Sequence, residues 1–126
     1  MKIIISNSCP VPIYEQIKDQ IISQIMADEL HEGEPIPSIR ALANDIKISV
    51  MTIKKAYDEL ESEGFIKSIQ GKGTFVAPKN TQLAREKANK EIEDHMFKII
   101  DIANRFNISK EEIYDLFEFI YRSDEQ

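Results

Sequence analysis

Apolar residues recur at every third or fourth position after Pro12, which is the spacing of an amphipathic helix. The stripe consists of Ile13, Ile17, Ile21 and Ile25, with Tyr14 and Leu30 beside it. Proline is tolerated in the first turn of a helix because its missing N–H is not needed there. We therefore expect a helix of roughly 17 residues from Pro12. A short strand at 3–5 precedes it, and Gly33, Pro35 and Pro37 end it.

Two shorter helices are expected next, each starting after a serine. Ser38 and Ser49 are placed to cap the N-termini of these helices. The first ends near Asp45 and the second near Ser62, where Gly64 is placed to form a left-handed cap. Their apolar faces are Ile39, Leu42 and Ala43 in the first, and Ile53, Ala56, Tyr57 and Leu60 in the second.

A hairpin follows the third helix. Residues 65–70 and 74–76 have the composition of strands. Gly71, Lys72 and Gly73 between them supply the positive φ angles that a tight hairpin turn requires. The order helix, short helix, helix, hairpin is that of a winged helix-turn-helix, in which a helix enters the major groove of DNA.

The remainder of the chain is charged and helical. A long helix carries the apolar stripe Leu83, Ala84, Ala88, Ile92, Met96, Ile99 and Ala103. Asn107 interrupts it, and Ser109 with Glu112 has the spacing of a capping box for a last helix. That helix carries Ile113, Leu116, Phe117 and Ile120 on one side.

These elements predict a mainly α fold with a small β-hairpin (α+β), in two parts. Residues 1–78 are expected to form a winged helix-turn-helix domain, and residues 79–126 a helical tail. The length of 126 residues suffices for one well-buried core with a small appendage, and falls short of two full-sized domains.

The formal net charge of −6 argues against a nucleic-acid partner only as an average over the chain. Residues 1–35 carry two Lys or Arg against six Asp or Glu, and residues 80–126 carry seven against eleven. Residues 36–79 carry seven against five, so only this part has a cationic surplus. An anionic partner is therefore expected to bind there.

No feature of the sequence indicates export or membrane insertion. The apolar runs, such as 3–5 and 75–77, are far too short to cross a bilayer. The N-terminus lacks the long apolar stretch of a signal peptide. Cys9 is the single cysteine, so no internal disulfide is possible, which fits a reducing compartment. We expect a cytoplasmic protein with no membrane partner.

Four collinear segments resemble the DNA-binding domain of the GntR family of bacterial transcription regulators. They are residues 12–17, 36–43, 52–64 and 71–76. The positions to which the resemblance assigns DNA contacts are Arg40, Ser49, Thr52, Lys54 and Gly71, the last at the wing tip. Many members have arginine where this chain has Val50, so its operator is expected to differ from theirs.

The chemistry of the same segments extends this set. The candidate DNA-binding residues are Arg40, Ser49, Val50, Met51, Thr52, Lys54, Lys55, Gly71, Lys72 and Gly73. Lysines neutralise phosphates or meet guanine acceptors, and Val50 or Met51 is suited to a thymine methyl group. The alternative for Lys54 and Lys55 is a solvated helix face, and for Lys72 a solvated surface turn.

The tail is too short for the large effector domains of the family and resembles that of the YtrA-type branch, which implies dimerisation. Its large apolar residues lie on more than one side of just two helices, so a partner chain is expected to cover them. The candidate dimerisation residues are Ile92, Met96, Ile99, Phe117 and Ile120. The alternative is that the tail folds back on the DNA-binding domain.

We therefore expect a DNA-binding transcription regulator, a repressor that binds a pseudo-palindromic operator as a homodimer. The branch also implies targets that include transporter operons. The alternative is a protein-interaction adaptor, whose binding would lack the steep salt dependence of DNA binding. No catalytic set or cofactor motif occurs, so neither an enzyme nor a cofactor is expected. His95 and Glu91 share a helix face but lack a third metal ligand, and the sequence identifies no effector.

Overall fold

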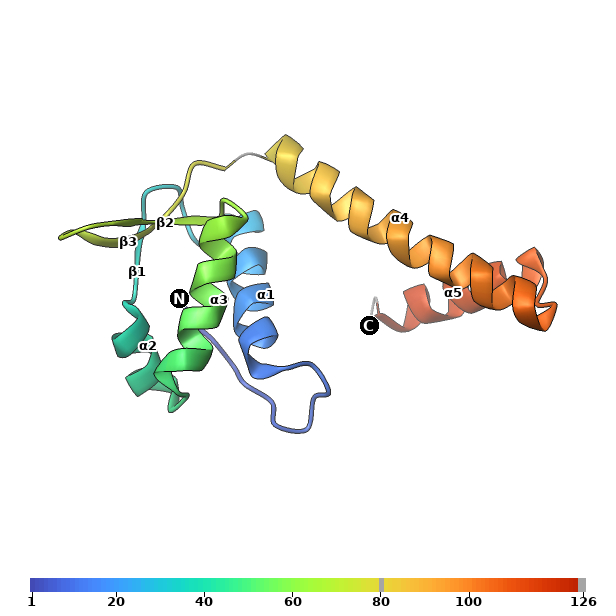
Figure 1. Cartoon of the computed structure of the whole chain (residues 1–126), viewed down its shortest axis with the longest axis horizontal. Helices are drawn as coiled ribbons and strands as arrows, with labels where there is room; N and C mark the ends of the chain where they lie inside the picture. Colours follow the sequence, from blue (N-terminus) through green and yellow to red (C-terminus); the bar gives the residue numbers. More distant parts are fainter. Residues whose placement is uncertain (80, 125–126) are drawn as a thin grey trace. The chain divides into compact units, whose positions relative to one another are not determined.

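The computed structural model describes residues 1–79 and 81–124, in two units, Met1–Asn80 and Thr81–Gln126 (Figure 1). The elements of the first unit are α1 (Ile13–Met26), β1 (Pro35–Ile36), α2 (Ile39–Ile46), α3 (Val50–Ser62), β2 (Ile66–Ile69) and β3 (Gly73–Val76). Those of the second are α4 (Thr81–Phe106) and α5 (Lys110–Asp124). The predicted fold class, mainly α with a small antiparallel sheet, is confirmed.

The core of the first unit lies where α1, α2 and the sheet meet α3. α1 and α2 both pack against α3. The side chains that are fully buried are Ile17, Ile21, Ile53, Leu60, Ile66 and Val76. Each such side chain contributes about 1.5–3 kcal/mol by leaving water. This packing fixes α3 in one rotation about its axis and so decides which of its faces stays outside.

β1 is a strand that the sequence did not predict. The sheet has the order β1-β3-β2, and both pairs are antiparallel. Pro35 of β1 pairs with Phe75 of β3. Proline has no N–H to donate, which an edge strand tolerates. Just before it, the Glu34 carbonyl accepts from the Val76 N–H at 2.9 Å. The prolines that argue against a strand here therefore fit its position at the edge.

The strand predicted at 3–5 is wrong, because this segment pairs with no strand among the described residues. Residues 2–6 instead lie alongside α1. Three glutamine side chains of α1, each one helical turn from the next, form hydrogen bonds with the backbone of every second residue of this segment. The pairs are Gln24 with Lys2, Gln20 with Ile4 and Gln16 with Ser6; in each, the amide side chain accepts from the N–H and donates to the C=O. Four helical residues rise about 6 Å and two extended residues about 6.6 Å, so the spacings match. We call this set the glutamine ladder.

The second unit consists of two helices. Asn107, with φ 54°, follows the end of α4. Ser109 and Glu112 form the predicted capping box: Glu112 Oε2 accepts from Ser109 N at 3.0 Å, and Ser109 Oγ accepts from Glu112 N at 3.2 Å. Over residues 82–124, the only buried side chain is Ala103. No helix among the residues that the structure describes is both long and apolar enough to cross a membrane.

Candidate nucleic-acid interface

α2 and α3 are joined by a tight, capped turn. Ser38 Oγ accepts from Ala41 N at 3.1 Å, and Ser49 Oγ accepts from Thr52 N at 3.2 Å, so both serines cap helices as predicted. Lys47, between the helices, has φ 58° in the left-handed region. The turn places the first residues of α3 at the surface of the unit.

The outward face of α3 carries most of the candidate contacts. Met51 lies two positions before the buried Ile53, which is about 200° around the helix, so it faces away from the core. Met51 is 73% exposed and Val50 41%. The exposed Lys54 pairs with Asp58 at 2.7 Å. A DNA phosphate must therefore compete with a carboxylate for Lys54.

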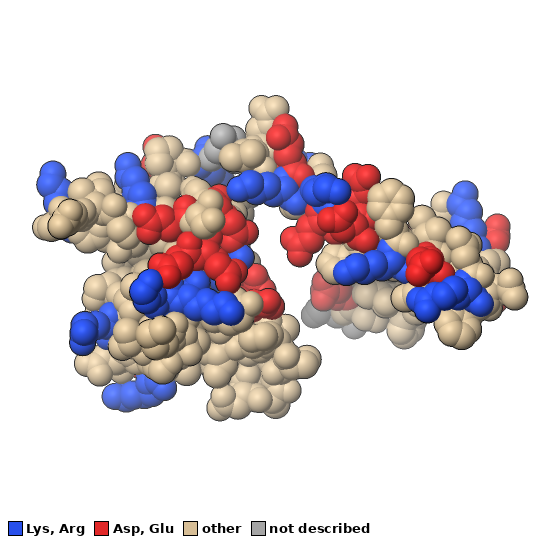
Figure 2. Space-filling model, viewed as in Figure 1, with Lys and Arg blue, Asp and Glu red and all other residues tan. Residues whose placement is uncertain are grey.

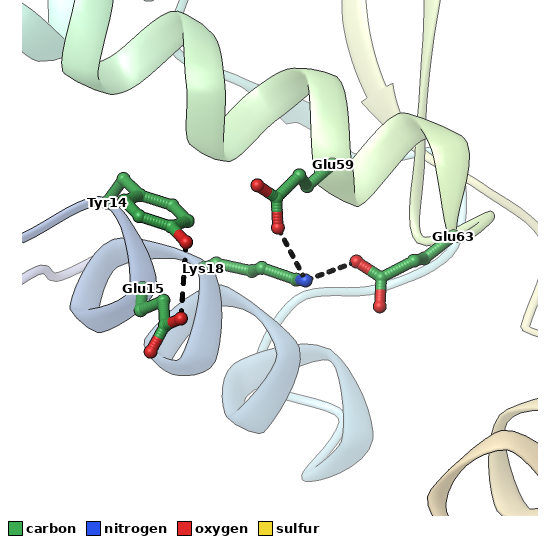
Figure 3. A network of polar contacts seen from close by, with 5 residues as sticks. All are labelled: Tyr14, Glu15, Lys18, Glu59 and Glu63. Carbon is green, nitrogen blue, oxygen red and sulfur yellow. Dashed lines mark hydrogen bonds and ion pairs between the residues drawn. The ribbon is translucent and has the colours of Figure 1, made fainter. Parts of the chain in front are cut away.

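Lys55 is held against α1. Its Nζ lies 4.2 Å from the centroid of the Tyr14 ring, which is a cation–π distance. The Tyr14 hydroxyl donates to Glu15 Oε1 at 3.2 Å (Figure 3). Desolvation and this carboxylate raise the pKa of Tyr14. The spacing of lysines along α3 gives no sign of this ring, because the ring belongs to another helix.

Lys18 on α1 bridges two carboxylates one turn apart, one in the last turns of α3 and the other on the residue that caps its C-terminus (Figure 3). Its Nζ lies 3.0 Å from Glu59 Oε1 and also contacts Glu63 Oε2. Burial opposes the charge of Lys18, but hydrogen bonds to Glu63 and Glu59 outweigh it and raise its pKa. We call these three residues the α1–α3 clamp. The clamp ties the C-terminal half of α3 to α1 and neutralises part of its acidic surface.

Arg40, in the first turn of α2, is exposed, and its side chain has no partner in the described part of the chain. Tyr57 anchors the segment before it, because its hydroxyl donates to the Pro37 carbonyl at 2.8 Å. Burial raises the pKa of Tyr57, so the phenol remains a donor. A free guanidinium on an anchored turn is suited to bind phosphate or guanine.

The β2–β3 hairpin is the wing. Gly71 and Gly73 have φ values of 80° and 119°, as the predicted tight turn requires, and Lys72 N donates to the Ile69 carbonyl at 2.9 Å. Lys72 is exposed at this tip. In Figure 2, basic side chains lie over the hairpin and α2, whereas acidic ones gather over α1 and the C-terminal half of α3.

The structure brings α2, the beginning of α3 and the wing to one side of the first unit, at the left in Figure 1. Three exposed cations of residues 36–79 were not predicted as contacts: Lys47 in the turn before α3, Lys67 on β2, and Lys79 after β3. Lys79 pairs with Asp28 at 3.1 Å, whereas Lys47 and Lys67 have no side-chain partner among the described residues. In the sequence, these lysines contribute to the cationic surplus of residues 36–79, but that surplus does not show which of the lysines lie near the interface.

The candidate dimerisation residues all lie at the surface of the second unit. Ile92, Met96, Ile99, Phe117 and Ile120 are between 44% and 56% exposed. Among the described side chains, no group of three or more His, Cys, Asp or Glu is arranged to hold a metal ion.

Comparisons with known proteins agree with this architecture. The family model for bacterial regulatory proteins of the gntR family matches residues 13–76. The uncharacterized HTH-type transcriptional regulator YhcF of Bacillus subtilis is 32% identical over 104 residues, which cover 82% of this chain and 85% of YhcF. The HTH-type transcriptional repressor YtrA of the same organism is 31% identical over 104 residues, covering 82% and 80%. The repressor NagR, also from B. subtilis, is 42% identical over 79 residues, but the match spans only 32% of its length.

Solved structures share the fold at similar identity. The transcriptional antiterminator from Listeria monocytogenes EGD-e has a TM-score of 0.74 at 34% identity, over 96% of this chain and 90% of that chain. AraR(DBD) in complex with operator ORX1 has a TM-score of 0.54 at 32% identity, over 61% of this chain and 96% of that chain.

Proposed function

Since the chain belongs to the GntR family of bacterial regulatory proteins, in its YtrA-type branch, and is thus a DNA-binding transcription regulator, we propose that it acts as a homodimeric repressor. Each copy binds one half of a pseudo-palindromic operator in the cytoplasm. Control of a transporter operon is part of the proposal. The family and the relatives reported above are transcription regulators and not enzymes.

The observation that carries the DNA-binding mode is the placement of three elements on one side of the first unit. The first turn of α3 presents exposed side chains, Arg40 of α2 has no side-chain partner among the described residues, and the wing presents Lys72 between two glycines. The clamp holds the acidic end of α3 against α1. We infer that α3 enters the major groove while the wing contacts the adjacent backbone.

Replacing Arg40 by alanine tests this arrangement. Arg40→Ala removes a guanidinium that has no partner in the part of the chain that the structure describes. The substitution is therefore expected to weaken operator binding by more than about 1 kcal/mol without changing stability. Fluorescence anisotropy with the full chain measures it. Arg85→Ala is the matched control, because Arg85 near the start of α4 is also exposed and has no side-chain partner among the described residues; it is expected to leave affinity unchanged. Unchanged affinity of Arg40→Ala would remove this residue from the interface.

The salt dependence of the same titration tests the nature of the partner. Affinity for DNA should fall steeply as salt rises, because bound counterions leave the phosphates on association. An adaptor that binds another protein would show no such slope. Binding that does not change between low and high salt would therefore favour the adaptor.

The tail supports the homodimer part of the proposal. Over residues 82–124 nearly every large apolar side chain is exposed, and two helices cannot cover these residues by themselves. A second copy supplies an identical apolar surface, and a two-fold axis matches two inverted half-sites.

Charged substitutions at this surface test the dimer. Replacing both Ile99 and Phe117 by glutamate is expected to give monomers in analytical ultracentrifugation. Lys98→Glu is the control, because it adds negative charge at an exposed polar position of the same helix. A dimer that persists in the double variant would refute the assignment of the tail.

A further inference from the structure

Met51 is the most exposed of the large apolar side chains that the structure describes, at 73%. Isolated apolar side chains at a surface are common, so exposure alone assigns no role. Met51, however, lies in the first turn of α3, opposite the buried Ile53, and Val50 next to it is 41% exposed. The end of the helix that meets base edges therefore carries an apolar surface.

The hydroxyl groups beside Met51 are already engaged. Ser49 Oγ caps α3 by accepting from Thr52 N, and it lies 2.9 Å from Thr52 Oγ1. The two lysines of the next turn also have partners, a carboxylate and an aromatic ring. The first turn of α3 thus has few unengaged side-chain donors, and its most exposed large apolar side chain is the thioether of Met51.

The major groove displays one kind of apolar group, the C5-methyl group of thymine. On the premise of the proposed operator binding, we propose that Met51 contacts the C5-methyl group of one thymine in each half-site and so specifies a T·A pair there. An unbranched, polarizable methionine side chain adapts to such a methyl group. The same chemistry applies to 5-methylcytosine, and thymine is the source that unmodified DNA provides.

The test starts from a binding site selected by the full chain from random-sequence DNA. Each thymine of that site is replaced in turn by deoxyuridine, which removes only the methyl group. Loss of one buried methyl contact is expected to weaken binding about fourfold at one thymine of each half-site. When that T·A pair is replaced, a site with 5-methylcytosine·guanine should be bound about fourfold more tightly than a site with cytosine·guanine. This comparison distinguishes the effect of the methyl group from that of the base that carries it.

Two variants assign the effect to Met51. For Met51→Ala, the ratio of the affinities for the thymine and deoxyuridine sites should fall to about one, because the methyl group has lost its contact. For Lys54→Ala, the affinity for both sites should fall, but the affinity ratio of about four between the thymine and deoxyuridine sites should remain. An unchanged ratio in Met51→Ala, or no sensitive thymine in the site, overturns the assignment and leaves operator binding intact. If no site can be selected at all, the proposed function fails as well.

Discussion

Replacing Gln16 by alanine removes three hydrogen bonds at the most buried position of the glutamine ladder. Gln16 Oε1 accepts from Ser6 N at 3.0 Å, and Gln16 Nε2 donates to the carbonyls of Ser6 at 3.0 Å and of Val11 at 2.8 Å. A net contribution of about 1 kcal/mol for each bond predicts a loss of about 2–3 kcal/mol. Gln20 makes two bonds in a more exposed setting, so Gln20→Ala should cost about 1 kcal/mol. Gln24→Ala should cost less, because one of its bonds is 3.5 Å long.

Thermal unfolding of the full chain, followed by circular dichroism, measures this order. Protein concentration must be held constant, because association shifts the apparent Tm. Gln16→Ala is expected to lower the Tm by about 10 °C or more. Gln82→Ala is the matched control, since Gln82 is exposed on α4 and has no side-chain partner among the described residues. It should change stability by less than about 0.5 kcal/mol.

Hydrogen exchange provides the result that would refute the ladder. The N–H groups of Ile4 and Ser6 are bonded to glutamine side chains, whereas those of Ile3 and Ile5 have no partner in the described part of the chain. Amide exchange measured by NMR should therefore be slow at Ile4 and Ser6 and fast at Ile3 and Ile5. Equal exchange rates at all four residues would show that the segment does not lie along α1 in this register.

Two further changes test how α3 is held. Lys18→Met should destabilise the fold by at most about 1 kcal/mol, because both glutamates of the clamp are partly screened by water. The pKa of Lys18 in the folded state is raised above 10.5, so the stabilisation by the clamp is present at neutral pH and is lost as the pH rises through that raised pKa. The free energies of unfolding of the original protein and of Lys18→Met, measured in urea, should therefore differ at pH 7 and become equal at strongly alkaline pH. Gly64→Ala should destabilise the fold by about 1 kcal/mol, because Gly64 has φ 85°, a backbone conformation that is strained for alanine, although an added Cβ would touch no neighbouring atom. Ser62→Ala, two residues earlier, should destabilise the fold less. Equal losses of stability in the two variants would contradict this reading.

The elements that the sequence predicted well are those in which local chemistry decides the conformation. Ser38 and Ser49 cap α2 and α3 because a serine hydroxyl reaches an N–H three residues on. Gly64 follows α3 in the left-handed region, and Phe65 N then donates to the Leu60 carbonyl at 2.9 Å. These contacts involve neighbours in the sequence, so a short window contains all the information they need.

The features that were missed depend on partners far apart in the sequence. Three successive isoleucines favour a strand, but only the fold reveals that the side chains of α1, and no strand, lie beside them. Lys55 resembles a free groove contact until the ring of Tyr14 comes to lie beneath its ammonium group. The positions of the candidate site could therefore be predicted from the sequence. The partners that each of their side chains contacts within the fold could not.

The small cationic surplus of residues 36–79 is an argument for the proposed homodimer. Residues 36–79 carry seven cationic against five anionic side chains, and Lys54 already shares its charge with Asp58. One copy is therefore expected to neutralise few phosphates and to bind DNA with low affinity. Once a tail-to-tail dimer holds a second copy near the operator, the second binding event is intramolecular and gains an effective concentration in the millimolar range. The double tail variant at Ile99 and Phe117 should then lose more operator affinity than Arg40→Ala, although the tail supplies no proposed DNA contact.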